Sequence, residues 1–418
     1  MTRRILDPRL WAEGQRKIDW ANRFMPVTNA LGANLAESGS VAGKRIALVL
    51  VLEPKTANLA LRLAEAGADV SVVCHASSTR DDTAAALDHA GVTVFSRTDA
   101  TAEEDRAFAL ELLDGRPDIL VDDGSSVTRL AHTHRPLVLE TMIGATEETT
   151  SGLRPLRVME ADGELRIPVL AANDAQCKTL FDNGYGTGQS TLFTMLDLLG
   201  APLTGKRVVI AGYGYVGRGV AREAAAMGAR VTIAEVDAVK ALEATFAGFR
   251  VDTLSAAAST ADLLISATGI AHTIDVEHLL ALPSGAAVAV AGGVDQEIAI
   301  DAVLAVGATR HPAGELIERF ALPGGRDILI LDDGGCINCT AGEGNPIEIM
   351  DLSFGVQLAA IEHLATSGRG LAPAVHLLPK SVDDRVARAK LASLGAALDV
   401  PSAAQQQFLA SWRTGVMS

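Results

Sequence analysis

The chain of 418 residues carries a net charge of −15 at pH 7, with 48% hydrophobic and 21% charged residues. This balance is typical of a globular enzyme of one to three domains and excludes a disordered chain. The acidic surplus argues against a nucleic-acid partner, because no excess of basic residues is present to neutralise phosphates. No signal peptide and no apolar run long enough to span a bilayer are visible, so a cytoplasmic protein without a membrane partner is expected.

The first part of the chain alternates between helical and strand patterns. Such alternation predicts parallel βαβ units and therefore a first α/β domain. The expected helices cover residues 9–24, 56–66, 84–90 and 103–113, and the expected strands cover residues 45–52, 69–74, 92–95 and 119–121.

Acidic residues follow several of these strands. Glu53 comes after the first strand, Asp122 and Asp123 follow the fourth, and Glu147 and Glu148 stand further on. In open α/β sheets the carboxyl ends of the strands border the ligand crevice, so these side chains are candidates for catalysis. They could equally cap the helices that follow, and their position alone does not separate the two roles.

Residues 169–189 are dense in charged, amide and glycine residues. The pattern predicts a short helix, a glycine-broken loop around Gly184 and Gly186, and then a helix that ends near Leu199. A hinge is expected here, because the segment lies between the first domain and the next. Taken alone, Lys178 in this segment is interpreted as a solvated helix lysine.

A dinucleotide-binding pattern occupies the centre of the chain. Its parts follow the order of strand, glycine turn, helix, strand and acid. They are a strand at 208–211, the turn Gly212-Tyr213-Gly214-Tyr215-Val216-Gly217, a helix at 218–227, and a strand at 229–234 that ends at Glu235.

Each part of this pattern has a physical role. Gly212 permits the tight turn, Gly214 leaves room for the pyrophosphate, and Gly217 lets the helix pack closely on the strand. The N-terminus of the helix offers free N–H groups to the phosphates. Glu235 would accept hydrogen bonds from the ribose hydroxyls and repel a 2′-phosphate, so the pattern predicts NAD rather than NADP as the cofactor.

The remaining segments complete a second domain and return to the first. The predicted fold is α/β, with two Rossmann-like, doubly wound parallel-sheet domains joined by hinges: a substrate-binding domain at 1–185, completed by 353–400, and a NAD-binding domain at 186–352, before a tail at 401–418. The elements expected after Glu235 are strands at 261–266 and 286–291, a hairpin-like pair of 327–331 with 336–338, a hinge helix at 350–366, and a strand and helix at 373–379 and 383–397 that rejoin the first domain.

Two of the four cysteines, Cys336 and Cys339, form a Cys-x-x-Cys motif. Such a motif can be half of a zinc site or a redox pair. No second Cys-x-x-Cys and no nearby Cys-x-x-His completes a ligand set, so no metal is predicted. The other interpretation is a pair of ordinary reduced cysteines in a strand and loop.

Many short motifs of the chain occur together in one order, and on them the sequence resembles the S-adenosyl-L-homocysteine hydrolase family over nearly its whole length. The resemblance implies a substrate domain and a NAD domain, and a homo-oligomer, either a dimer or a tetramer. The matching motifs are Asp122-Asp123-Gly124, Glu147-Glu148-Thr149-Thr150, Asn173-Asp174, Lys178, Phe181-Asp182-Asn183, Tyr185-Gly186, Gly212-Tyr213-Gly214, Val216-Gly217-Arg218-Gly219, Thr268-Gly269, Asn338 and Leu378-Pro379-Lys380.

The resemblance also implies a mechanism on a nucleoside. Bound NAD would oxidise the sugar at C3′, the C4′ proton would become acidic, the 5′ group would leave, water would add, and the ketone would be reduced again. Lys178 matches the family lysine beside the 3′-hydroxyl, and its pKa is expected to be lowered by burial. Asp182 and Glu148 would hold the ribose diol, and Asp123 matches the acid near C4′ and C5′.

The other site residues implied by the resemblance fall into two sets. The cofactor set is Thr149, Thr150, Asn183, Gly212, Gly214, Tyr215, Val216, Gly217, Glu235, Thr268 and Asn338. The substrate set is Glu53, Lys55, Thr56, Asn345, Met350 and Phe354.

The sequence departs from the family pattern mainly near the 5′ position of the substrate. Family histidines are replaced by Val51, Gly293 and Asn345. Four further positions differ: Lys55 and Glu53 stand where the family has a glutamate and a threonine, Thr187 replaces a cysteine, and Lys240 replaces an asparagine beside the NAD ribose. The closing family tail, which is basic and contains a tyrosine, is not seen before Met417 and Ser418.

These departures predict a shortened reaction, in which a nucleoside loses its 5′-hydroxyl as water and becomes a 4′,5′-unsaturated nucleoside of the angustmycin type. Asp123, with help from Glu53, would supply the acid that hydroxide needs as a leaving group. Two alternatives stay open. One is an ordinary S-adenosyl-L-homocysteine hydrolase that yields adenosine and homocysteine, and the other is a non-catalytic NAD-binding regulator.

Overall fold

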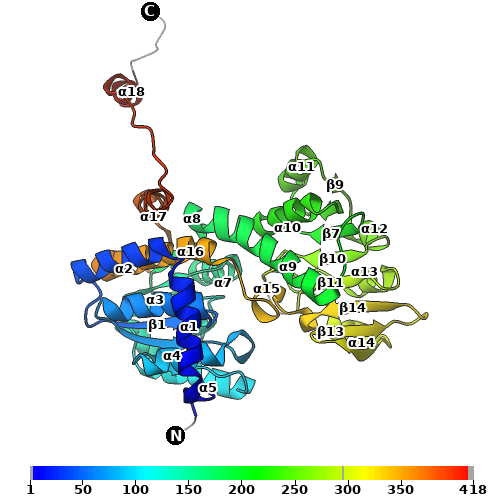
Figure 1. Cartoon of the computed structure of the whole chain (residues 1–418), viewed down its shortest axis with the longest axis horizontal. Coiled ribbons are helices and arrows are strands. Elements are labelled where there is room, and N and C mark those ends of the chain that lie inside the picture. The colour runs from blue at the N-terminus through cyan, green and yellow to red at the C-terminus, as the bar shows by residue number, and fades with distance from the viewer. Residues whose placement is uncertain (1–2, 294–295, 413–418) are drawn as a thin grey trace, which may run out of the picture.

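The computed structural model describes residues 3–293 and 296–412. Two α/β domains, each built on one sheet, lie side by side (Figure 1). The chain builds most of the first domain, crosses into the second, and returns along α16 (Ile347–Ser367) to complete the first. The fold class predicted from the sequence is confirmed.

The first sheet has seven strands in the order β15-β6-β5-β4-β1-β2-β3, and all its pairs are parallel. Its edge strand β15 comes from late in the chain and pairs with β6. The strands are β1 (Arg45–Val49), β2 (Asp69–Val73), β3 (Thr93–Phe95), β4 (Ile119–Asp122), β5 (Gly144–Glu147), β6 (Val169–Ala171) and β15 (Val375–Leu377).

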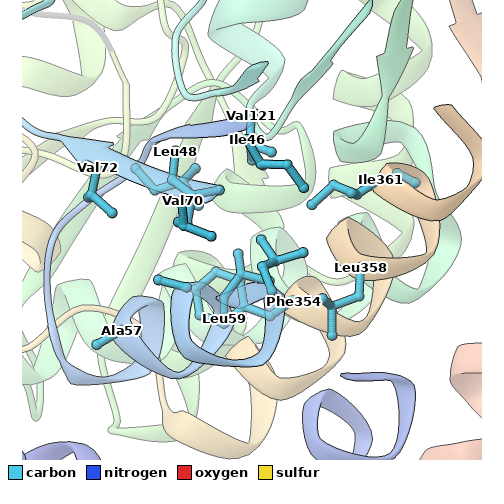
Figure 2. Close-up of a cluster of buried hydrophobic side chains, with 14 of the residues drawn as sticks. Ile46, Leu48, Ala57, Leu59, Val70, Val72, Val121, Phe354, Leu358 and Ile361 are labelled. Atoms are coloured by element: carbon cyan, nitrogen blue, oxygen red, sulfur yellow. The ribbon is translucent and has the colours of Figure 1, made fainter. Parts of the chain in front are cut away.

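Helices cover both faces of this sheet, because successive side chains of each strand point to opposite faces. Ile46 and Leu48 of β1 pack against α3 and α16, as Figure 2 shows, whereas Ala47 and Val49 belong to a second apolar cluster on the other face. The helices of this domain are α1 (Trp11–Asn22), α2 (Pro26–Ser38), α3 (Pro54–Glu65), α4 (Asp81–His89), α5 (Ala102–Asp114), α6 (Ser126–His134) and α7 (Thr150–Ala161).

The second sheet has eight strands in the order β12-β13-β14-β11-β10-β7-β8-β9. Its Rossmann part is parallel, and β12, β13 and β14 form an antiparallel extension. The strands are β7 (Arg207–Ala211), β8 (Arg230–Ala234), β9 (Arg250–Val251), β10 (Leu263–Ser266), β11 (Ala287–Val290), β12 (Thr309–Gly314), β13 (Ile317–Ala321) and β14 (Asp327–Leu331).

The expected pairing of residues 327–331 with 336–338 is wrong. β14 pairs with β13 and β11, and Ile337–Thr340 forms a short helix, α15. The hairpin is closed instead by a turn in which Leu322 N–H donates to Arg326 O at 2.7 Å, with Gly324 and Gly325 at positive φ. This Pro-Gly-Gly turn was the sequence signal for the hairpin.

The expected glycine-broken loop is also wrong. Residues from Gln176 onward are helical without interruption: α8 (Gln176–Lys178), a π-helix (Thr179–Gly186) and α9 (Thr187–Leu199). Gly188 of α9 serves close packing, because a Cβ there would lie 2.5 Å from the carbonyl carbon of Gly219 in α10 (Tyr215–Ala226). π-Helical turns are rare and concentrate at functional sites.

The remaining helices surround the second sheet or follow the last strand of the first. No helix in the described part of the chain is long and apolar enough to cross a membrane. These helices are α11 (Ala238–Phe246), α12 (Leu254–Ala258), α13 (Val276–Ala281), α14 (Ile300–Ala305), α17 (Lys380–Ser393) and α18 (Ala403–Leu409).

Candidate active site

The parallel register brings the acidic strand ends of the first sheet together. Asp122 of β4 is paired with Glu147 of β5, and the next residue of each chain segment, Asp123 and Glu148, continues toward the crevice. Consecutive residues of an extended chain point in opposite directions. The two double-acid motifs therefore each supply one acid to the interior and one to the site.

The inner acids hold the loops in place. Asp122 Oδ2 accepts the N–H of Thr128 at 2.7 Å, and Glu147 accepts the N–H groups of Gly124 at 2.9 Å and Ser125 at 2.8 Å. Burial raises the pKa of Asp122 to about 6 and raises that of Glu147 well above its ordinary value. These two acids are capping and bracing groups, the alternative role that the sequence left open.

Lys178 lies at the centre of the outer cluster and is buried, with 3% of its surface exposed. Its Nζ donates to Asn183 Oδ1 at 2.7 Å and lies 3.3 Å from Asp182 Oδ2 and 3.9 Å from Glu148 Oε1. Asp182 and Asn183 lie in the π-helix and both contact the lysine. Because Lys178 is buried and paired, the interpretation as a solvated helix lysine is wrong.

The expected lowering of the Lys178 pKa is wrong for the protein in this form. Burial by itself lowers the pKa of an ammonium group, but the charges of Asp182, Glu148 and Asp123 outweigh it and raise the pKa. Lys178 is therefore a firmly protonated cation among carboxylates.

Glu148 is the carboxyl group that holds a proton near neutrality. Burial raises its pKa to about 8, although the positive charge of Lys178 opposes the shift. Its Oε2 accepts from Gln357 Nε2, and its buried Oε1 has no hydrogen-bond partner among the described residues. A buried polar atom without a partner is costly in a folded protein, and a sugar hydroxyl would satisfy it.

Sequence reasoning missed two residues of α16 that organise the cluster. Ser353 Oγ donates to Asp182 Oδ2 at 2.7 Å, and Gln357, one helical turn later, donates to Glu148. Both side chains are fully buried. The signal was available: Ser353 and Gln357 are the polar residues of the otherwise apolar stretch 352–361, and residues four apart on a helix face the same side.

Two residues of the substrate set, Met350 and Phe354, lie on α16 but do not join the polar cluster. Phe354 is buried in the apolar core beside Leu59 of α3 (Figure 2), and Met350 packs against the same cluster. A role in substrate binding stays a prediction for both, limited to an apolar part of the ligand.

Asn345 links the lysine cluster to the second domain. Its Nδ2 donates to Asp182 Oδ1 and to Thr187 Oγ1, and its Oδ1 accepts from Ser190 and from Asn338 Nδ2 at 3.2 Å. The amide thus places two predicted site residues, Asn345 and Asn338, in one hydrogen-bond chain with Asp182.

Asp123 stands at the partly exposed mouth of the cluster. Burial of its carboxyl raises its pKa, while the charge of Lys178 lowers it and that of Asp182 raises it further. The group is placed to exchange protons with a ligand in the crevice.

A second polar group lies at the end of β1, where α3 begins. Lys55 Nζ is 3.0 Å from Glu53 Oε2 and donates to Glu343 O of the second domain at 2.8 Å. Thr56 is buried beside them. A narrow cavity here is lined by Val51, Glu53, Ser78, Arg80, Cys339, Gly342, Glu343 and Gly344.

The glycine turn of the second domain fits a dinucleotide. Gly212 has φ +95°, and a Cβ on Gly217 would lie 2.1 Å from Gly212 O. A Cβ on Gly214 would meet nothing within 4 Å. Gly212 and Gly217 are therefore required by the fold, whereas the space above Gly214 is open for the pyrophosphate that the pattern predicts.

Other predicted cofactor residues border the same edge of the second sheet. Glu235, at the end of β8, accepts the N–H of Tyr213 at 2.7 Å. Thr268 follows β10, and Tyr215 and Val216 begin α10. Lys240 lies in α11, 3.9 Å from Asp237.

The cofactor residues Thr149 and Thr150 come instead from the first domain. Thr149 accepts the N–H of Gly152 and so caps α7, and Thr150 accepts from Asn173, which in turn accepts from Asn183. The structure therefore connects these threonines to the lysine cluster. No group of three or more potential metal ligands occurs in the part of the chain that the structure describes.

The two sheets, the glycine turn and the adjoining acid define a two-domain NAD-binding protein of the Rossmann class. Residues 183–344 match the description "S-adenosyl-L-homocysteine hydrolase, NAD binding domain", and residues 3–137 match "S-adenosyl-L-homocysteine hydrolase". The chain is 40% identical to the adenosylhomocysteinase of Thermotoga maritima over 401 residues, 96% of this chain and 99% of that protein. It belongs to the S-adenosyl-L-homocysteine hydrolase family.

Another group of relatives carries a different name. The chain is 41% identical to the S-inosyl-L-homocysteine hydrolase of Methanopyrus kandleri, with 98% of this chain and 97% of that protein covered. The protein of the same name from Methanocaldococcus jannaschii is 39% identical, with 98% of this chain and 99% of that protein covered. The chain is thus about equally similar to relatives named for an adenosyl and for an inosyl substrate.

Proposed function

We propose that this protein is a NAD-dependent hydrolase of a purine nucleoside that is joined through its 5′ carbon to homocysteine. S-adenosyl- and S-inosyl-L-homocysteine are the two candidate substrates. The observation that carries the proposal is the buried Lys178, held between Asp182 and Glu148 on the side of the first domain that faces the NAD-binding domain. Full-length similarity to hydrolases of both substrates supports it.

In this proposal the side chains of the first domain hold the sugar. The unpartnered Glu148 Oε1 and the carboxylate of Asp182 accept hydrogen bonds from the ribose hydroxyls. NAD, bound at the glycine turn and Glu235, would accept the hydride from C3′ and later return it. As the hydride leaves C3′, the carboxylate of Asp182 takes the proton of the 3′-hydroxyl, and Lys178, an ammonium group, stabilises the negative charge that develops on the 3′ oxygen.

Proton transfer at C4′ and C5′ falls to Asp123 in this proposal. A ketone at C3′ acidifies the C4′ proton, Asp123 takes that proton, and the 5′ sulfur leaves with the electrons of its bond to C5′. Water then adds to C5′ as a proton returns to C4′. A general base in such a position contributes about 10²- to 10⁴-fold to the rate.

Incubation of the protein and NAD with each thioether in deuterated water tests the proposal. The expected products are free homocysteine and a nucleoside that carries solvent deuterium at C4′, detected by mass spectrometry. Asp123→Asn should abolish the exchange, and Asp114→Asn serves as the control, since the exposed Asp114 at the end of α5 pairs with Arg135 away from the cluster. Absence of both thiol release and exchange in the unmutated protein would refute the proposal.

A second candidate function, dehydration of a nucleoside at C5′, is favoured by one feature. Val51 lines the narrow cavity beside Glu53. A Cβ on Gly293 would lie 1.8 Å from Glu297 Oε1, so that position accepts no side chain without rearrangement. Neither position offers an imidazole to help water add at C5′.

The same assay with adenosine separates the two functions. Dehydration predicts a product lighter by one water that contains a 4′,5′ double bond, with no homocysteine required. A non-catalytic NAD-binding regulator, the remaining alternative, predicts neither product and no exchange with any nucleoside.

A further inference from the structure

Cys336 and Cys339, the cysteine motif that the proposed reaction does not use, stand at the two ends of one helical turn. Cys336 is the N-cap of α15, and its carbonyl accepts the N–H of Cys339 at 2.8 Å. Helix geometry separates such Cα atoms by about 5 Å, within the range that a disulfide spans. Both cysteines are free and partly exposed as residues, and Cys339 S–H donates to the Cys336 sulfur.

The two other cysteines, Cys74 and Cys177, lie in very different surroundings. Burial raises the pKa of each to about 12, and each thiol is enclosed in the first domain. By contrast, the pKa of Cys336 is lowered, mainly by the hydrogen bond from Cys339. Burial opposes this shift, and the N–H groups of Gly293 and Gly292 add to it. A thiol that ionises more readily is the better nucleophile in disulfide exchange.

We propose that Cys336 and Cys339 are a redox modification site that closes to a disulfide by exchange with a small disulfide such as glutathione disulfide. The Cys336 thiolate attacks one sulfur of that disulfide and releases one thiol. Cys339 then loses its proton and attacks the Cys336 sulfur of the mixed disulfide, which releases the second thiol. Two protein thiols and one disulfide thus yield one protein disulfide and two small thiols.

Formation of this disulfide changes the hydrogen bonds of Asn338, which lies between the two cysteines in the sequence. In the dithiol form Cys336 Sγ donates to Asn338 Oδ1 at 3.1 Å, and Asn338 Nδ2 donates to Asn345 Oδ1. A disulfide has no S–H group, so the first of these bonds is lost. Asn338 is a predicted NAD contact, and we expect the disulfide form to bind NAD about fivefold more weakly, as for the loss of one hydrogen bond.

The experiment uses the full chain in which Cys74 and Cys177 are replaced by serine, so that only the motif can react. The protein is incubated with glutathione disulfide, its mass is measured, and its affinity for NAD is determined by fluorescence titration. Loss of the mass of two hydrogen atoms, a roughly fivefold rise in Kd and full recovery with dithiothreitol are expected. Neither readout requires the substrate, so the result is independent of the proposed hydrolase function.

Variants of the motif decide how the affinity change arises. Cys336→Ser, made in the same background, should retain its NAD affinity after treatment. Cys339→Ser should stop at the mixed disulfide, which also removes the Cys336 S–H group and should therefore weaken NAD binding as well. Failure of the dithiol protein to lose two hydrogens would overturn the proposed modification. A disulfide without any change in Kd, or an equal loss of affinity in the Cys336→Ser variant, would overturn the proposed link to Asn338.

Discussion

The ligand sites at the carboxyl ends of the two sheets are built from different chemical groups. At the first sheet, the carboxyl groups of Asp123, Glu148 and Asp182 surround the buried ammonium group of Lys178. At the second sheet, Gly212 and Gly214 remove side chains, so that backbone N–H groups and empty space remain. The same parallel architecture thus builds one site from ionisable side chains and the other from bare backbone.

The difference shows what each kind of site requires from the rest of the fold. Buried charges need bracing, which Asp122 and Glu147 provide below the site and Ser353 and Gln357 provide from α16. A backbone site needs only the tight turn and the close packing of a helix. We therefore expect substitutions in the first site to act through charge and proton position, and those in the second to act through space.

The largest expected effect is that of Lys178→Gln. The substitution removes the ammonium group at the centre of the cluster formed by Asp123, Glu148 and Asp182, so negative charge on the 3′ oxygen loses its partner. The rate of deuterium exchange at C4′ should fall at least about 10³-fold. Lys206→Gln, on the far side of the second domain, is the control and should retain the rate. A residual rate above about one tenth would remove Lys178 from the mechanism.

The second-largest expected effect distinguishes the roles of Glu147 and Glu148, the two acids of one motif. Glu147→Gln should lower the free energy of unfolding by about 2–4 kcal/mol, because a carboxylate that accepts from Gly124, Ser125 and Thr149 becomes an amide that cannot accept from all of them. Glu148→Gln should change stability far less and reduce the exchange rate instead. Urea unfolding of both variants measures the difference, and similar losses of stability would contradict the division into inner and outer acids.

The third effect separates two glycines of the cofactor turn. Gly217→Ala places a methyl group 2.1 Å from Gly212 O and should destabilise the protein by about 1–3 kcal/mol. Gly214→Ala meets open space, so its stability without ligand should stay within about 0.5 kcal/mol of the original. The affinity of Gly214→Ala for NAD should nevertheless fall about tenfold or more, as measured by fluorescence titration. Unchanged affinity would show that the pyrophosphate does not lie above Gly214.

The smallest effect concerns the pH dependence of the reaction. Glu148 has a pKa of about 8, so its protonated form predominates at neutral pH, and a rate that depends on this form should fall as the pH rises through 8. Gln357 donates to the carboxylate and so lowers this pKa. Gln357→Leu should therefore move the alkaline limb of the pH–rate profile upward by about 0.5–1 unit.

The control for this shift is Ser353→Ala, which removes the corresponding donor to Asp182. It should slow the reaction without moving the limb that reports Glu148. A limb that moves equally in both variants would mean that α16 acts on the site as a whole and not through single hydrogen bonds.

The misses of the sequence analysis have one physical origin. Gly184 and Gly186 were interpreted as helix breakers, yet they lie in a continuous helix that packs against distant segments: a Cβ on Gly186 would lie 3.0 Å from the Asn345 side chain, and a Cβ on Gly219 of α10 would lie 2.6 Å from Gly184 O. Cys336 was expected in a strand because it follows β14, but the hairpin had already been closed on the other side by β13. Local patterns do not reveal which distant segment will pack against them.

The amino-acid order by itself determined the alternating βαβ plan, the glycine turn before Glu235 and the set of ionisable residues at the strand ends. These features depend on backbone geometry and on periodicity, which act over a few neighbouring residues. Only the tertiary structure decided that Lys178 is a buried cation and that Ser353 and Gln357 hold its carboxylates. The charge state of a buried group depends on the sum of its surroundings, and for Lys178 that sum comes from Asp123, Glu148 and Asp182, which lie on three separate segments of the chain.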